Sequence, residues 1–227
     1  MVFLKISAAV FAAAALLQLS APLAHAQSQP TQCGSLNNAY GPLDYRSQRA
    51  NLKVVEDFHF TPEVEALIRG KSAPLGGDLD YTLRASPNHH RALIALARFA
   101  ERSNSDKLPD TKYTVGCYFD RAMRFAPDDT IVRMIYAGHL GRTNRVEQAR
   151  QQLDTVASAV TDSPFTHYSL GSSYFDIKQY DKALHHAHKA HALGFPRTEL
   201  RDALRKVGKW VEPVAVMPAA SAASGPG

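Results

Sequence analysis

The sequence predicts an all-α protein built from helix-turn-helix repeats and closed by a C-terminal capping helix. Apolar residues recur at helical spacing along most of the chain, and small or apolar residues return at a regular longer interval in its second half. Gly, Pro and Asn residues separate these segments. The chain of 227 residues can bury a sizeable core, and its 45% hydrophobic residues exclude a chain that is disordered throughout.

Residues 1–26 are predicted to be a secretory signal peptide. Lys5 precedes an apolar run, and Ala24-His25-Ala26 places small residues at a cleavage site before Gln27. An uncleaved anchor is the alternative, although the apolar run is short for a bilayer. We therefore expect a bacterial protein that is periplasmic or secreted, with no membrane insertion of the mature chain.

The charge and the cysteine count narrow the classes of function. A net charge of +5 is too small to indicate a nucleic-acid partner. Two cysteines, Cys33 and Cys117, exclude a cysteine-rich scaffold and a four-cysteine zinc site. Because export permits oxidation, a disulfide between them is predicted, with two unpaired buried thiols as the alternative. The bridge would hold the N-terminal extension, residues 27–55, against a helix in the middle of the chain.

The predicted helical domain, residues 56–211, begins with two short helices. The first starts at Thr61-Pro62 and ends at Gly70. A turn at residues 74–77 leads to the second helix, residues 78–85. The inward-facing residues of the first helix are predicted to be Val64, Leu67 and Ile68.

Two longer units follow. Helix 90–101 is joined by a lengthened polar loop, residues 103–112, to a helix that ends at Ala126-Pro127. Helices 130–140 and 146–156 then flank a break at residues 141–145. Their apolar faces are Leu93, Leu96, Ala97 and Ala100, then Ile131, Met134, Ile135 and Leu140, then Val146, Ala149, Leu153 and Val156.

The last repeat carries the most specific pattern. Its residues for repeat packing are Leu170, Gly171, Tyr174, Tyr180, Ala183, Ala190 and Pro196. This pattern resembles the tetratricopeptide repeat, a family with two antiparallel helices in a unit of about 34 residues. The resemblance implies an α-solenoid that binds protein and needs no cofactor. His167 and Ala187 depart from it, because the family often has Trp and an aromatic residue there.

The C-terminal part is expected to close the array. Residues 196–211 are predicted to form the capping helix that covers the last repeat. Its apolar residues are Leu200, Leu204, Val207 and Val211. Residues 212–227 are rich in Pro, Ala, Ser and Gly and are expected to be a disordered tail.

The resemblance also implies a partner-binding groove on the first helix of each repeat. The positions carried over are Arg91, Ile94 and Arg98, then Ile131 and Met134, then Phe165, Tyr168, Ser172 and Phe175. Such a groove would suit an extended or helical segment with apolar anchors and an acidic residue. The alternative is that the extension or the tail fills the groove, or that these residues belong to the core.

No catalytic set is found, so an enzyme is not expected. Gly70-Lys71-Ser72 lacks the upstream Gly of a phosphate-binding loop, and Asp78 is expected to offset a helix dipole. His185 and His188 are spaced so that they could form a weak metal pair. The repeat register instead places the histidines of residues 185–191 on a solvated outer face.

The sequence thus predicts a non-enzymatic scaffold or adaptor that binds a protein or peptide segment in its groove. The alternative is an accessory protein of an envelope or polysaccharide pathway, with a weak His-based metal or substrate site.

Overall fold

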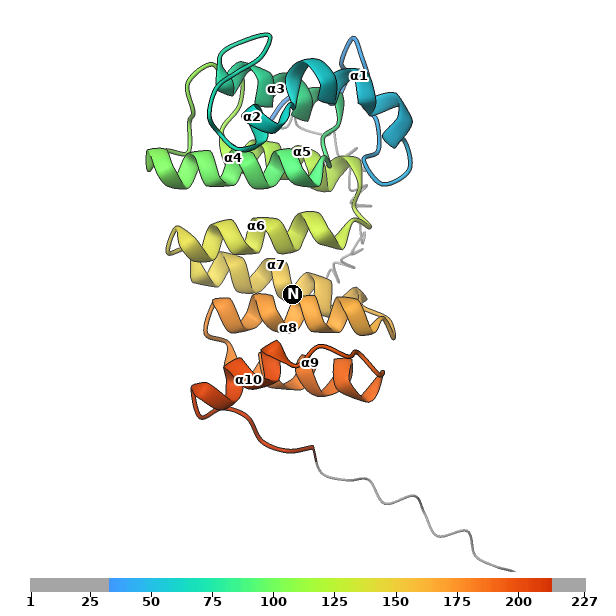
Figure 1. The fold of residues 1–227 in the computed structure, drawn as a ribbon, viewed down its shortest axis with the longest axis vertical. Coiled ribbons are helices and arrows are strands. Elements are labelled where there is room, and N and C mark those ends of the chain that lie inside the picture. Colours follow the sequence, from blue (N-terminus) through green and yellow to red (C-terminus); the bar gives the residue numbers. More distant parts are fainter. Residues whose placement is uncertain (1–32, 214–227) are drawn as a thin grey trace, which may run out of the picture. The chain divides into compact units, whose positions relative to one another are not determined.

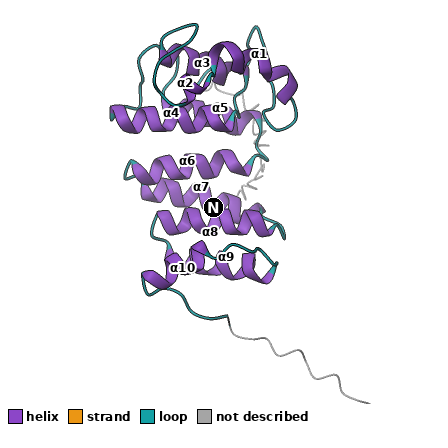
Figure 2. Cartoon of the chain, in the orientation of Figure 1, coloured by secondary structure: helices purple, strands orange, loops and turns teal. Residues whose placement is uncertain are grey.

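Ten helices make up residues 33–213, the part of the chain that the computed structural model describes (Figure 1). They are α1 (Arg49–His59), α2 (Pro62–Glu65), α3 (Leu75–Ala85), α4 (His90–Ser103), α5 (Val115–Phe125), α6 (Thr130–Arg142), α7 (Val146–Ala159), α8 (Pro164–Asp176), α9 (Tyr180–Ala192) and α10 (Glu199–Lys206). These residues include no strand, which confirms the predicted all-α class (Figure 2). The predicted signal peptide and nearly all of the predicted tail lie outside the described residues.

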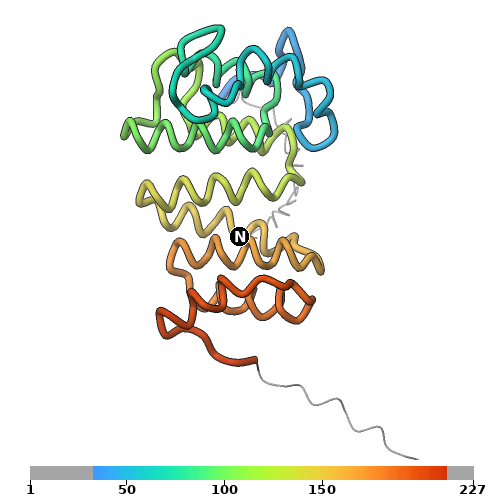
Figure 3. The backbone as a smooth tube through the Cα atoms, viewed as in Figure 1, coloured from blue at the N-terminus to red at the C-terminus, as the bar shows by residue number. Residues whose placement is uncertain are grey.

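Helix pairs organise the described fold. The most extensive helix contacts are those of α6 with α7 and of α8 with α9. In addition α4 contacts α6, and α6 contacts α8, so the first helices of successive units pack side by side (Figure 3). At the C-terminal end α10 contacts both α8 and α9, in the position predicted for a capping helix.

Side chains before the first turn fix where several helices begin. Thr114 before α5 and Ser163 before α8 each accept a hydrogen bond from a main-chain N–H of the first turn. Pro164 then occupies the first position of α8, where no N–H is needed. Asn104 ends α4 in the left-handed conformation, which starts the predicted long loop to α5.

Two large apolar clusters form the core. The first joins α2 to α6, and Leu93 and Leu96 of α4 are fully buried in it. The second joins α6 to α10 and includes Leu153 and Leu170. Tyr136 on α6 packs against both clusters, so α6 links the two halves of the described fold.

The predicted repeat-packing positions cluster where α8, α9 and α10 meet. Leu170, Tyr174, Ala183 and Ala190 are buried, Tyr180 is half-buried and Pro196 is exposed. A Cβ atom on Gly171 would lie 2.7 Å from Leu200 Cδ2 and 3.2 Å from the Ala183 carbonyl oxygen. Glycine therefore permits the close approach of these three helices.

Helix α1 was not predicted, and it crosses the predicted boundary between residues 55 and 56. Leu52 and Val55 are buried, but Phe58 is 55% exposed and Val54 is also exposed. These exposed apolar residues blur the helical pattern, and Gln48 provides no side-chain cap. Sequence periodicity therefore gives little sign of this helix.

Three other predicted elements are corrected. Helix α2 is one turn long, because the chain turns at Leu67 with φ 59°, so Ile68 is 72% exposed rather than inward-facing. Helix α3 begins at Leu75, inside the predicted turn. Helix α10 starts later than predicted and ends at Lys206, which leaves Val207 and Val211 exposed. Val146, predicted to face inward on α7, is exposed at its first position.

Candidate functional site

The α4 part of the predicted groove lies at the surface. Arg91, Ile94 and Arg98 are exposed. Arg91 is already paired, because its Nε donates to Glu65 Oε1 over 2.8 Å and its guanidinium lies over the Phe60 ring. The same hydrogen bonding lowers the pKa of Glu65. Arg98 makes no hydrogen bond or ion pair with the described residues.

The α6 and α8 parts lie mostly at the margin of the second core cluster. Met134 is 8% exposed, and Ile131 is partly buried beside it. Tyr168 and Phe175 of α8 also pack against this cluster, and the Ser172 hydroxyl donates to the main chain of its own helix. Met134 is therefore buried, and the other four residues are half-buried. Phe165 differs, because it is 56% exposed.

Tyr168 lines a cavity of about 250 Å³ at the junction of α8, α9 and α10. Its ring centroid lies 4.7 Å from that of Phe195, and Phe195 lies 6.3 Å from Phe165. Arg197 lies over the Tyr168 ring at 5.3 Å, and Trp210 also lines the cavity. We call this the Tyr168 cavity.

Among the residues that line this cavity, Tyr168 was a predicted groove position, Ala190 and Pro196 were predicted repeat-packing positions, and Phe195, Arg197 and Trp210 were not predicted. Phe195 and Arg197 flank Pro196 in the loop before α10, and Trp210 follows that helix. The repeat pattern gives a position to Pro196 but none to the residues on either side of it, so Phe195 and Arg197 were not assigned. The one Trp of the chain was an available signal.

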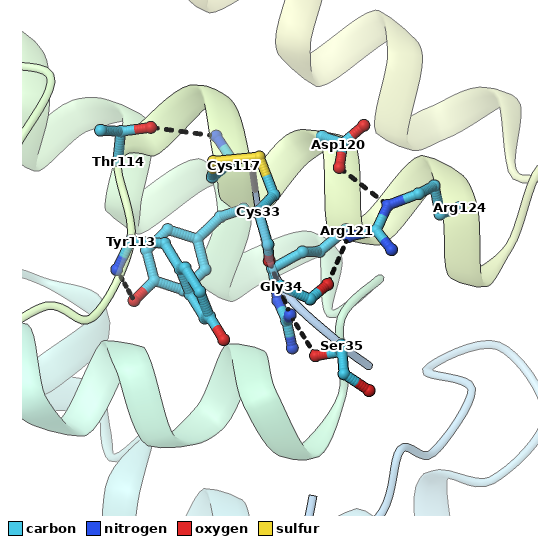
Figure 4. Close-up of a disulfide and its surroundings, with 10 residues drawn as sticks. Cys33, Gly34, Ser35, Tyr113, Thr114, Cys117, Asp120, Arg121 and Arg124 are labelled. Carbon is cyan, nitrogen blue, oxygen red and sulfur yellow. Dashed lines mark hydrogen bonds and ion pairs between the residues drawn. A yellow bond between two sulfur atoms is a disulfide. The ribbon is translucent and has the colours of Figure 1, made fainter. Parts of the chain in front are cut away.

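The predicted disulfide is present and holds the extension on α5. Cys33 and Cys117 are bonded, with a sequence separation of 84 (Figure 4). One face of α5 continues the attachment, because Arg121 Nη1 donates to the carbonyl oxygens of Cys33 and Ser35 over 3.0 and 2.6 Å. Arg124 Nη2 donates to the Gly34 carbonyl oxygen over 3.1 Å.

Further contacts hold the extension against the end of α3 and the loops beside it. Leu43 N–H donates to the Ala85 carbonyl oxygen, and Tyr45 N–H donates to Asn88 Oδ1 over 3.0 Å. Arg46 pairs with Asp128 in the loop before α6. These polar contacts place residues 33–46 along α3, α5 and the loops beside them, rather than on the predicted groove positions.

The histidines of α9 do not share one outer face, which corrects the prediction for His186. Its side chain is only 6% exposed, and its Nδ1 lies 2.9 Å from Nδ1 of His167. His185 is exposed as predicted, and His188 Nε2 lies 2.8 Å from the Val211 carbonyl oxygen. Within residues 33–213, no group of three or more His, Cys, Asp or Glu side chains could hold a metal ion.

The acidic residues near α3 have structural roles. Asp78 is fully buried and accepts hydrogen bonds from the N–H groups of Lys71 and Ser72. It therefore anchors the loop before α3, besides lying in the first turn of that helix as predicted. Asp80 accepts from the Tyr118 hydroxyl and from Arg84 Nε. Burial raises the pKa of Tyr118, and the hydrogen bond to Asp80 raises it further.

The chain matches no protein-family model, no characterised protein and no solved structure. Between residues 33 and 213 no helix combines the length and apolar character needed to cross a bilayer. The disulfide hints at an oxidising compartment.

Proposed function

We propose that the chain is a non-enzymatic protein-interaction module built as a tetratricopeptide-like solenoid. The starts of two helix pairs support this proposal. Helices α6 and α8 begin at Thr130 and Pro164, and helices α7 and α9 begin at Val146 and Tyr180. Both pairs therefore repeat at the same interval, which equals the tetratricopeptide period of about 34 residues. Equal spacing with repeated side-by-side packing is typical of repeat arrays.

The observation that carries the binding role is the exposed Phe165 beside the Tyr168 cavity. Phe165, Phe195 and Tyr168 form a continuous aromatic surface at this end of the fold. A partner segment that inserts one apolar side chain here would bury aromatic surface. Aromatic contacts of this kind dominate the binding energy of many interfaces. The proposed partner is therefore a protein or peptide segment with an apolar anchor.

The proposal includes location outside the cytoplasm, in the periplasm or the secreted fraction, after cleavage before Gln27. The disulfide supports it, because structural disulfides persist in oxidising compartments and are rare in the cytosol.

A matched pair of variants tests the binding role. Peptides selected from a random phage-displayed library on the mature chain are measured against Phe165→Ala and Phe58→Ala by fluorescence anisotropy. Both residues are exposed to nearly the same degree, but Phe58 lies on α1. We expect Phe165→Ala to weaken binding by about tenfold or more, since truncating an aromatic anchor often costs about 2 kcal/mol. Phe58→Ala should leave binding unchanged.

Two results would contradict this proposal. Selected peptides that bind Phe165→Ala as tightly as wild type show that the partner uses another surface. Peptides whose binding is weakened only by Phe58→Ala would show that the binding surface lies on α1. Equal melting temperatures of the two variants exclude unfolding as the cause.

A further inference from the structure

A polar cavity of about 420 Å³ lies beside the C-terminal ends of α4 and α6. Its lining differs from that of the Tyr168 cavity, and it includes none of the predicted groove residues. The residues that matter for its chemistry are Glu101, Asp106, His139, Arg142, Thr143 and Arg145.

His139 organises the wall of this cavity. It is buried, with Nδ1 3.0 Å from Glu101 Oε1 and Nε2 3.0 Å from Arg145 Nη2. A guanidinium can only donate, so Nε2 accepts and the proton of the imidazole sits on Nδ1, which donates to Glu101. Burial lowers the pKa of His139, in keeping with this neutral form. The side chain therefore holds Glu101 and Arg145 in fixed positions.

The two arginines of the cavity differ in their partners. Arg142 Nε donates to Glu101 Oε2 over 2.8 Å, so its charge is compensated. Arg145 is half-buried, and its Nε and Nη2 donate to the Thr143 hydroxyl and to His139. Both acceptors are neutral, and Arg145 forms no ion pair with the described residues. Its positive charge is therefore uncompensated in a partly desolvated place, where charge interactions are stronger than in water.

The acidic residues of the cavity do not cancel this charge. Glu101 is paired with Arg142 and accepts a hydrogen bond from the neutral His139. Asp106 is exposed and makes no ion pair with a described residue, so solvent screens it. The cavity thus offers two guanidinium groups, and Arg145 forms no ion pair with either carboxylate that lines it.

We propose that this cavity is a carboxylate-binding pocket, with Arg145 as the main donor and Arg142 as the second. A planar guanidinium presents paired N–H groups that match the two oxygens of a carboxylate. This proposal rests on the proposed function, because the carboxylate is carried by the partner segment. It also moves the acidic contact away from Arg91, which Glu65 already occupies. The carboxylate belongs either to an acidic side chain or to a chain terminus.

Three short peptides separate these sources. The peptides are Ac-Ala-Glu-Ala-NH2, with a side-chain carboxylate, Ac-Ala-Ala-Ala-OH, with a terminal carboxylate, and the neutral Ac-Ala-Gln-Ala-NH2. Each is titrated into the mature chain, and NMR follows the Arg145 Nε–Hε signal and the Thr143 amide. We expect one or both carboxylate peptides to shift these signals, and the source follows from which one does. Equal shifts with the neutral peptide, or no shift with any of the three, would overturn the proposal.

Charge-matched variants complete the test. Arg145→Gln should weaken binding of the carboxylate peptide by about tenfold, as loss of a charged hydrogen bond does. Arg69→Gln removes the same charge from an exposed position in the loop after α2 and should leave binding unchanged. Retention of binding in Arg145→Gln, or an equal loss in Arg69→Gln, would overturn the proposal. If Arg145→Gln does not fold, the wild-type Arg145 shift and the exposed Arg142→Gln variant decide the question.

The two proposals fail separately. The tripeptides carry no large apolar side chain, so Phe165→Ala should not change their binding. If no carboxylate peptide binds, the proposal for the Tyr168 cavity still stands. If Phe165→Ala leaves the binding of the selected peptides unchanged, the proposal for the carboxylate pocket still stands.

Discussion

The Nδ1 atoms of His167 on α8 and His186 on α9 lie 2.9 Å apart, and both side chains are buried. One Nδ1 must donate and the other accept, so the two neutral rings hold opposite tautomers. Tyr174 stacks on His186 with ring centroids 5.6 Å apart. Burial lowers the pKa of His186 to about 4 and also lowers that of His167.

Acid should therefore destabilise the fold. His186 and the buried His89, whose pKa burial lowers to about 3, are neutral in the fold but have an ordinary pKa of 6.5 when unfolded. Their stabilising contribution is complete above about pH 6.5 and is lost as the pH falls toward these folded values. Urea unfolding should show a loss of about 1–2 kcal/mol for each residue between about pH 7 and pH 5.

Neighbouring histidines give the control for this pH dependence. His186→Gln keeps a donor and an acceptor but does not titrate, so stability should fall less steeply with acid than in wild type. His185→Gln, at the exposed neighbouring position, should keep the wild-type slope. A profile that His186→Gln leaves as steep as before would show that His186 is not a source of the acid sensitivity.

The disulfide should contribute measurably to stability. Thiol titration of the unfolded chain without reductant should find no free thiol, and two free thiols would show that the bridge is absent. Replacing both Cys33 and Cys117 with Ser should lower the free energy of unfolding by up to about 4 kcal/mol in the chain-entropy model. The contacts of Arg121 and Arg124 with residues 33–35 remain in this variant, so the domain should still fold.

Packing between α8 and α9 should tolerate no larger side chain at Ala183. The residue is fully buried opposite Gly171, so Ala183→Leu should cost about 1–3 kcal/mol and lower the melting temperature. Ala192→Leu makes the same change at an exposed position of the same helix and should be nearly neutral. Equal melting temperatures of the two variants would contradict tight packing of Ala183 between α8 and α9.

Cleavage before Gln27 remains a prediction from the sequence. The intact mass of the exported protein should correspond to a chain that begins at Gln27. A mass that still includes residues 1–26 would show an uncleaved segment.

The helices α4 and α6 to α9 could be predicted because apolar stripes, Pro and Gly mark their faces and ends. His186 could not be placed in the same way. Ala183 and Ala190 were predicted packing positions, and both are buried together with Ala187. Position 186 is also covered, because His167 of α8 lies against it. The buried face of α9 is therefore wider than the positions of the three alanines alone indicate.

The predicted residues of the candidate site lie mostly on helices. Phe165 and Tyr168 were found from register, whereas Phe195 and Trp210 come from segments without a repeat position. The pairing of Arg91 with Glu65 joins residues 26 positions apart across an irregular segment, and no periodicity indicates it. The cavity at Arg145 was missed for the same reason, because it is built where helices end.

Arg121 and Arg124 hold the extension through main-chain oxygens, which every residue type provides. Evolutionary drift at the exposed Ser35 should therefore leave the attachment intact. Gly34 has no such freedom, because its φ is 70° and an added Cβ would lie 3.1 Å from the Tyr113 hydroxyl. Homologous chains should accordingly vary at position 35 while retaining glycine at 34, arginine at 121 and the two cysteines.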